Sequence, residues 1–581
     1  ASPMANYEYD ESSELSPSTI SSESSEVSEG SSGDLADLAD EDEVDNLQRE
    51  AEELRQKRKK LEFEVNEKWI GHYGSIFESL LKCKFDDIKF PVHPASDGGS
   101  NKKLRVLSFC SGTESQESAR DALLLAQFFA LKTIMDYHGD NVCVDLVASV
   151  DPFRPCHRFV WNNLSTDERE RGHYYNYVSE LSAGEAFCYF CDCCCVGPGR
   201  ASGCEGLSDG QAEDLDILVA GFPCPPFSTL NSHRQDKDFK FWNHPDGNVI
   251  VDIAHWVQTQ PKVPPKAIIL ENVPGAVAVS HKGRHNPLEF LMKGSVKNYK
   301  GLARFYYGLK HWGEYDLMKS NSGNEYFEIS AGEFGLPVHR KRIFFVLIRK
   351  DLASLEVRNS MAKLMKAATQ NPMRLETLSD IMMRHNPSSE GDIDLSEEPQ
   401  RKVNKHYKSK KEGGTWSMTQ NSISESMDFR EKHGLPEYGS DKMSSITPRR
   451  GILPDRERDI IDVIGLMHEK AGGIPEDLTI DVSQSLRRKP FNVNGKIPQL
   501  AKGSKIWYRG KILGPRTLFY AMGWGTSPLD FGSDVDRIRG VSLRVLLANM
   551  IAKPQIGLVQ LALLYSLRRF TLAPKAEQVE A

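Results

Sequence analysis

Five short apolar runs, separated by much longer stretches, constrain the fold more than any other feature of this sequence. The runs end in small or polar residues and cover 104–109, 144–150, 215–220, 267–270 and 343–348. An amphipathic helix is expected over 116–137, between the first two runs. Strands that alternate with helices predict an open, parallel α/β sheet. Ligands of such sheets bind beyond the carboxyl ends of the strands, so catalytic residues are expected there.

The chain has 581 residues, which allows about three domains. Residues 1–46 hold 14 Asp and Glu and no Lys or Arg, so the remainder carries a net charge of +6. This Ser-rich, acidic tail is expected to be disordered. The other predicted regions are a helical segment at 47–85, a catalytic domain at 102–350, a separate and irregular target-recognition region at 351–513, a return to the catalytic domain at 514–570, and a tail at 571–581. The return is expected to end in an apolar helix around Val545–Leu567.

The segment 44–65 shows apolar residues at helical spacing and a basic cluster from Arg55 to Lys60. The cluster is interpreted as a solvated helix face, with a nuclear-import signal or a dimerisation segment as alternatives. No stretch approaches 18 apolar residues and no secretory signal opens the chain, so neither a membrane span nor export is expected. The mildly basic remainder is compatible with a nucleic-acid partner.

All 11 cysteines lie at or before Cys224, and six crowd between Cys188 and Cys204 in an insert at 185–205. An odd number of cysteines in a chain without a signal favours free thiols or a metal site over disulfides. Buried thiols and a structural zinc site both remain open. The zinc ligands in the second case are Cys188, Cys191, Cys193 and Cys204.

Three polar groups follow or precede the apolar runs and carry the chemistry. Cys224, in Gly221-Phe-Pro-Cys-Pro-Pro-Phe-Ser228, stands between prolines directly after a strand and is a candidate nucleophile. Glu271 ends the next strand, before Asn272, Val273 and Pro274. Arg340 and Arg342 precede the last strand and point the same way from an extended chain. Taken alone, each group is more often a packed thiol, an ordinary strand-end acid or a solvated charge cluster.

In order, spacing and strand context, these groups together resemble the cytosine-C5 DNA methyltransferase family. Cys224 stands in the family's Pro-Cys motif, Glu271 to Val273 match its Glu-Asn-Val motif, and Arg340 and Arg342 match its Gln-x-Arg-x-Arg motif, with Val338 in place of the glutamine. Residues 246–257, 514–524 and Asn549 resemble further family segments. The resemblance covers about 104–350 and 480–565. It implies a Rossmann-like, S-adenosylmethionine-dependent methyltransferase sheet with an inserted target-recognition domain.

The resemblance also implies residue roles. Cys224 attacks C6 of a flipped cytosine, Glu271 contacts and protonates the ring, and Arg340 and Arg342 hold the base, its phosphate or the adduct. The implied substrate contacts further include Pro223, Ser228, Asn272 and Val273. S-adenosyl-L-methionine is the implied cofactor, with contacts at Phe109, Cys110, Ser111, Gly112, Glu114, Asp151, Pro152 and Asn549. The first cofactor motif departs from the family, because Ser115 replaces a second glycine and no acid begins the pattern.

The function expected from this resemblance is DNA cytosine-5 methylation in the nucleus, with DNA as the partner. An RNA (tRNA) cytosine-5 methyltransferase shares the same pocket chemistry and is the first alternative. A catalytically inert, DNA-binding regulatory member of the family is the second. The basic run at 401–411, with Tyr407 and Trp416 nearby, is interpreted either as a DNA contact or as a surface loop. The N-terminal helix is a candidate segment for homo- or hetero-oligomer formation.

Overall fold

The computed structural model describes a series of segments that together form a central sheet, its covering helices and a second, smaller sheet. The described residues are 68–90, 102–109, 124–138, 142–151, 164–183, 186–189, 193–196, 215–224, 226–227, 249–259, 264–277, 311–373, 377–385, 393–394, 420–449, 453–501, 503–524, 547 and 551–568. The predicted seam at 44–65, the basic run at 401–411 and both tails lie outside them. No helix among these segments is both long and apolar enough to cross a membrane.

The central sheet has eight strands in the order β3-β2-β1-β6-β7-β10-β8, with β9 also paired to β10. The strands are β1 (Lys103–Phe109), β2 (Cys143–Val150), β3 (His173–Tyr175), β6 (Ile217–Gly221), β7 (Ala267–Asn272), β8 (Tyr315–Leu317), β9 (Phe327–Ser330) and β10 (Lys341–Arg349). The five strands β3, β2, β1, β6 and β7 are parallel to one another. The predicted α/β sheet is thus confirmed. Strand β10 runs antiparallel to β7, β8 and β9, so the sheet is mixed, and the prediction that the run at 343–348 joins as a parallel strand is wrong.

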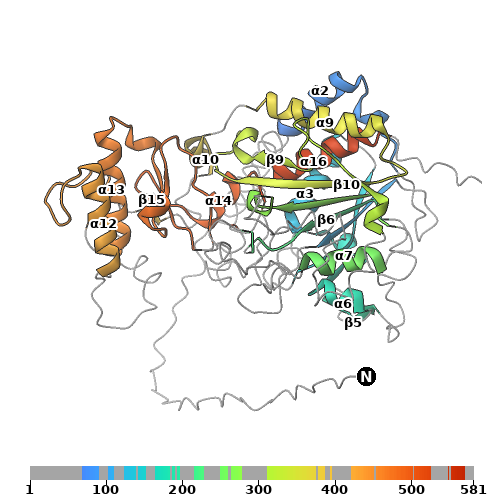
Figure 1. The fold of residues 1–581 in the computed structure, drawn as a ribbon, viewed down its shortest axis with the longest axis horizontal. Helices are drawn as coiled ribbons and strands as arrows, with labels where there is room; N and C mark the ends of the chain where they lie inside the picture. The colour runs from blue at the N-terminus through green and yellow to red at the C-terminus, as the bar shows by residue number, and fades with distance from the viewer. Residues whose placement is uncertain are drawn as a thin grey trace, which may run out of the picture. The chain divides into compact units, whose positions relative to one another are not determined.

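The apolar runs form central strands because both faces of the sheet are covered. Every residue of β6 and of β7 is buried, which explains why these segments are continuously apolar instead of alternating. Figure 1 shows helices on both faces. One face carries α2 (Lys68–Leu81), α3 (Leu124–His138), α9 (Leu355–Gln370) and α16 (Lys553–Ser566), and the other carries α6 (Val178–Ala183) and α7 (Val249–Thr259).

Helix α16 is the centre of the first helical layer, since it packs against α2, α3 and α9. All of its side chains are buried, as expected for the apolar helix predicted near the end of the chain. Trp69 of α2 lies directly over Gly557 of α16, where a Cβ atom would come within 2.3 Å of the indole ring. The close approach of these two helices therefore requires glycine at this position.

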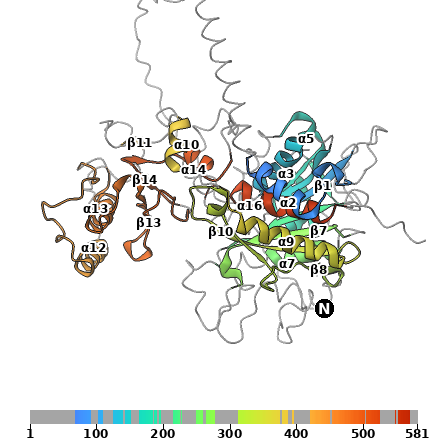
Figure 2. The same cartoon turned by 90° about the horizontal axis from the view of Figure 1, so that it is seen from above.

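The part of 351–513 that the structure describes is more regular than expected. Five short strands form a second sheet in the order β11-β15-β14-β12-β13. They are β11 (Ile393–Asp394), β12 (Thr479–Asp481), β13 (Phe491–Asn492), β14 (Ile506–Tyr508) and β15 (Lys511–Ile512). Helices α12 (Gln420–His433) and α13 (Asp455–Lys470) run side by side next to it (Figures 1 and 2). Short strands with little alternation explain why the sequence pattern missed this sheet.

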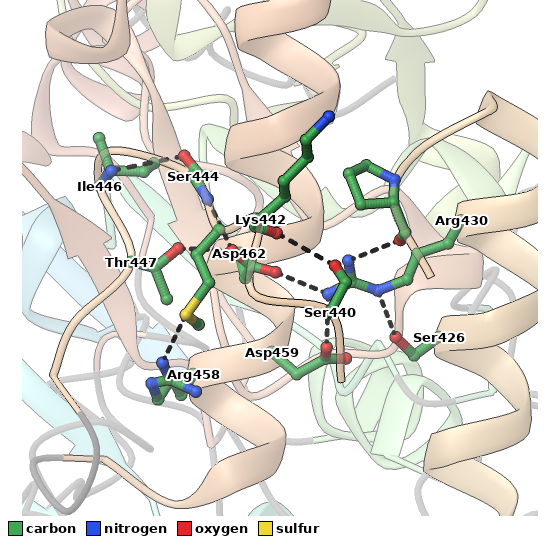
Figure 3. Close-up of polar contacts among 12 residues, drawn as sticks. Ser426, Arg430, Ser440, Lys442, Ser444, Ile446, Thr447, Arg458, Asp459 and Asp462 are labelled. Carbon is green, nitrogen blue, oxygen red and sulfur yellow. Dashed lines mark hydrogen bonds and ion pairs between the residues drawn. The ribbon is translucent and has the colours of Figure 1, made fainter. Parts of the chain in front are cut away.

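Buried charges join α12 to α13 (Figure 3). The guanidinium of Arg430 donates to Asp459 at 2.8 Å and to Asp462 at 2.7 Å, and all three side chains are at most 8% exposed. Asp462 also accepts hydrogen bonds from the Ser444 backbone and from Thr447. Burial alone lowers the pKa of Arg430, but its bonds to Asp462 and Asp459 outweigh burial and raise it. Arg430 is therefore charged and holds two helices and a loop together.

An isolated bridge connects the second sheet region to the segment just before β10. Ile497 forms an isolated bridge with Val338, in which the N–H of Ile497 donates to Pro337 and the N–H of His339 donates to Ile497. Helix α9, although it follows residue 351, packs against α2 and α16 and so covers the central sheet. The residue limits given above for the regions remain predictions.

Candidate active site

The ends of three neighbouring strands bring the predicted catalytic residues to one edge of the central sheet. Gly221 at the end of β6 lies opposite Glu271 of β7, and Glu271 lies opposite Phe344 of β10. Because β10 is antiparallel, its amino end meets the carboxyl ends of β6 and β7. Residues that stand 47 and more positions apart in the sequence therefore share one edge, as the apolar runs predicted.

Cys224 lies on a tight loop just beyond β6. Pro223 before it is buried, whereas Cys224 is partly exposed and carries a reduced thiol. The N–H of Phe227 donates to the Cys224 carbonyl at 2.9 Å, and the Phe227 ring packs edge-on against Phe222 at 5.5 Å. The loop thus fixes the backbone around the thiol and leaves Cys224 partly exposed. Ser228 lies outside the described residues.

Asn272 ties this loop to the end of β7. Its side-chain amide donates to the carbonyl of Phe222 at 2.8 Å, and its side-chain oxygen accepts from the N–H of Val273 at 2.8 Å. The side chain is 1% exposed, so both bonds are made away from water. Asn272 thus lies between the two loops and fixes their spacing, and its contact with substrate stays a prediction.

Glu271, Arg340 and Arg342 form a buried electrostatic cluster beside Cys224. The Nε of Arg342 lies 2.7 Å from Oε1 of Glu271, and both side chains are at most 6% exposed. Burial raises the pKa of Glu271, although Arg342 and Arg340 act in the opposite direction. Burial also lowers the pKa of Arg340, with Arg342 adding to this effect, whereas Glu271 and Cys224 oppose it. Arg340 therefore lies close enough to Cys224 and Glu271 to interact with both.

This arrangement combines the groups that nucleophilic attack on a ring requires. A partly exposed thiol next to a guanidinium is favoured as the thiolate, the reactive form of cysteine. A carboxyl group whose pKa is raised holds its proton more readily and can deliver it to a ring nitrogen. Two buried cations stabilise negative charge that develops in the same space. The edge can therefore support covalent attack, proton transfer and charge stabilisation together.

The predicted cofactor residues are only partly described. Phe109 ends β1, is fully buried and packs edge-on against Trp256 of α7 at 4.9 Å. Asp151 follows β2 directly, is 0% exposed, and its backbone N–H donates to Tyr175 at 3.0 Å. A buried carboxylate at the carboxyl edge of the second strand has the chemistry to accept ribose hydroxyls. The remaining cofactor candidates, Cys110, Ser111, Gly112, Glu114, Pro152 and Asn549, lie outside the described residues.

The cysteine-rich insert forms a short hairpin of β4 (Ala186–Cys188) and β5 (Cys193–Val196). The Cys188 sulfur accepts the Tyr174 N–H and lies 3.6 Å from Nδ1 of buried His173. Within the described segments no group of three or more His, Cys, Asp and Glu side chains is arranged to hold a metal. Cys191 and Cys204 fall outside these segments, so zinc binding by the four cysteines remains a prediction.

The sequence pattern missed a polar residue that contacts the backbone of Arg340, in the cluster of Glu271, Arg340 and Arg342. Gln555 of α16 is fully buried and donates to the carbonyl of Arg340 at 2.9 Å. Its only sequence signal is a glutamine inside an otherwise apolar helix, and nothing in the pattern shows which strand that helix covers.

Comparisons with known proteins agree with this geometry. Residues 207–469, which include the nucleophile loop, Glu271 and both arginines, match the model of the C-5 cytosine-specific DNA methylase family. DNA (cytosine-5-)-methyltransferase DMT5 of Cryptococcus neoformans is 31% identical over 176 residues, which cover 30% of this chain and 6% of that protein. DNA (cytosine-5-)-methyltransferase M.ApeKI of Aeropyrum pernix is 28% identical over 174 residues, which cover 27% of this chain and 32% of that protein.

The matched part of this chain thus spans about a third or less of each of these relatives. The crystal structure of the S. pombe Dnmt2 methyltransferase aligns with 80% of this chain and 98% of its own at 12% identity and a TM-score of 0.34, a score too low to add to the argument. The family model matches the segment that carries the catalytic edge. On this evidence, residues 207–469 of this chain are similar to the C-5 cytosine-specific DNA methylase family.

Proposed function

We propose that this protein transfers a methyl group to C5 of cytosine in DNA. The observation that carries the proposal is the convergence of Cys224, Glu271, Arg340 and Arg342 at one sheet edge. A scaffold that only bound DNA would have no chemical need to bury this set beside a partly exposed thiol. The names of the matched relatives support DNA as the substrate.

The chain's own residues account for the activation of the ring. The Cys224 sulfur attacks C6 and forms an S–C6 bond, while Glu271 delivers its proton to N3, so that electron density moves to C5. Arg340 favours the thiolate before attack, and its charge and that of Arg342 stabilise the ring as charge develops. After methylation at C5, a base removes the C5 proton, the electrons of that C–H bond form the C5=C6 double bond, and the S–C6 electron pair leaves with the Cys224 sulfur. N3 returns its proton to Glu271, so both side chains are restored. C6 is shielded inside a duplex, so the cytosine must leave the stack.

S-adenosyl-L-methionine fits the residues at the neighbouring strand ends. The buried Asp151 carboxylate would hold the ribose hydroxyls, and Phe109, whose ring packs against Trp256, ends the neighbouring strand β1. When bound, this cofactor supplies an electrophilic methyl group. The position of Asp151 at the end of β2, two strands from β6, places it along the same edge as Cys224.

We further propose that the protein acts in the nucleus and contributes to epigenetic regulation. The basic cluster at Arg55 to Lys60 provides the sequence feature for import. A fluorescent fusion and a variant with these cations replaced by glutamine test this directly. Nuclear fluorescence that persists in the variant would remove the basis for the import signal. Light scattering of the purified chain tests whether the N-terminal segment forms an oligomer.

A covalent trap tests the proposed reaction. The purified protein is incubated with labelled S-adenosylmethionine and DNA that contains 5-fluorocytosine, because fluorine cannot leave C5 as a proton does. We expect a labelled, denaturation-resistant protein–DNA complex that is absent in Cys224→Ala. A complex that forms with RNA but not with DNA would show that the substrate is RNA. No adduct on either, with DNA binding intact, would favour a regulatory protein without activity.

A further inference from the structure

Two glutamines interrupt the apolar helix α16, and one of them contacts the catalytic edge. Gln555 and Gln560 are both 0% exposed. The side-chain amide of Gln555 donates to the carbonyls of Ile329 and Arg340, each at 2.9 Å. Both partners can only accept hydrogen bonds, so the orientation of this amide is determined by its surroundings.

Packing alone does not explain a glutamine at this position. The side-chain oxygen of Gln555 is buried and has no hydrogen-bond partner in the described part of the chain. A buried acceptor without a partner disfavours the folded state. Methionine has nearly the same length and would fill the same space without that cost. The polar contact of Gln555 therefore calls for a second role.

That role follows from what the bonded carbonyl belongs to. The Arg340 carbonyl accepts two hydrogen bonds, one from Gln555 and one from the N–H of Ala331 at 2.8 Å. Just before it, the N–H of His339 bonds to Ile497 at 2.8 Å. The backbone is thus held from α16, from the start of the 3-10 turn at 331–334, and from the second sheet region. The Arg340 guanidinium that starts from this fixed backbone interacts with Glu271, Arg342 and Cys224.

We propose that Gln555 is a positioning residue, which fixes the backbone of Arg340 and thereby places its guanidinium beside Cys224 and Glu271. Val338, which stands where the family motif has glutamine, is fully buried and supplies no polar side chain. The side-chain amide next to this arginine pair comes from α16 instead. The inference rests on the proposed function for its effect on turnover, but its effect on the thiol does not depend on methyl transfer.

Gln555→Met and the matched control Gln560→Met test this. Both change one fully buried glutamine of the same helix to a side chain of similar length. The first measurement is the pH dependence of Cys224 alkylation by iodoacetamide, followed by mass mapping of the Cys224 peptide. We expect the curve of Gln555→Met to shift to higher pH, because the displaced cation no longer favours the thiolate. We expect kcat to fall about ten-fold or more with KM for S-adenosylmethionine unchanged. Gln560→Met keeps the wild-type values.

A double-variant cycle shows whether Gln555 acts through Arg340. Adding Gln555→Met to Arg340→Met should cause no further shift in the alkylation curve. An additive shift, or a Gln555→Met curve that matches Gln560→Met, would overturn the inference. If wild type transfers no methyl group, the proposed function fails, and the alkylation curves still decide the role of Gln555. Should Gln555→Met fail to fold, Gln555→Asn, whose amide is one methylene too short to reach both carbonyls, is measured in the same way.

Discussion

Replacing Arg430 by methionine removes the cation that joins α12 to α13. Methionine retains most of the volume but leaves Asp459 and Asp462 buried without an opposing charge. Breaking a buried ion pair by removing one partner costs about 3–5 kcal/mol. Asp462 keeps its bonds from Ser444 and Thr447, which places the expected cost at the lower end of this range. A loss of this size is a large part of the roughly 5–15 kcal/mol that stabilises a typical domain.

Hydrogen–deuterium exchange measures this loss locally. Amides of α12 and α13 in Arg430→Met should exchange about two orders of magnitude faster than in wild type, while β6 and β7 keep their protection. Asp428→Asn is the matched control: it removes a charge from the same helix, where the side chain is 68% exposed, and should change stability by less than about 0.5 kcal/mol.

The reasoning also predicts partial recovery. Adding Asp459→Asn and Asp462→Asn to Arg430→Met removes the unpaired charges and should restore part of the protection of α12 and α13. A cost below about 1 kcal/mol for Arg430→Met would refute the claim that this cluster holds the region together. A triple variant less stable than Arg430→Met would show that the cost arises from lost packing instead of unpaired charge.

Three further outcomes follow from single contacts. Gly557→Ala should lower the free energy of unfolding in urea by about 1–3 kcal/mol, because the new Cβ atom meets buried Trp69. Gly313→Ala, with open space around it, is the control and should leave stability unchanged. Equal effects of the two changes would contradict the role of the α2–α16 contact. Burial lowers the pKa of His138 to about 4, so protonation favours the unfolded chain, and the free energy of unfolding should fall as the pH drops from 6.5 to about 4. His138→Phe, which keeps the stack on Phe85, should lack this part of the pH dependence; an unchanged pH dependence in this variant would contradict the role of His138. Asn272→Ala should lower the free energy of unfolding by about 2–4 kcal/mol and the rate of methyl transfer at least ten-fold, because the Phe222 carbonyl and the Val273 N–H lose their partner beside Cys224. A near-normal kcat would show that the Cys224 loop keeps its position without the Asn272 side chain.

The sequence by itself determined five of the eight strands of the central sheet, namely β1, β2, β6, β7 and β10, and the residues at their ends. Continuous apolar runs such as those of β6 and β7 leave little choice but a sheet covered on both faces. Polar residues directly after such runs must lie at the sheet edge, so Cys224 and Glu271 could be assigned to one site from their positions alone. The same local information predicted the apolar helix that became α16.

Only the tertiary structure decided which residues meet across elements that are distant in the sequence. The direction of β10, the pairing of Arg342 with Glu271 and the contact of Gln555 with Arg340 each depend on long-range packing. The second sheet escaped prediction because its strands, at two or three residues, are too short to show a period. Arg430 shows the same limit: its sequence surroundings are those of a polar surface helix, and its charge is buried only because α13 brings Asp459 and Asp462 against it.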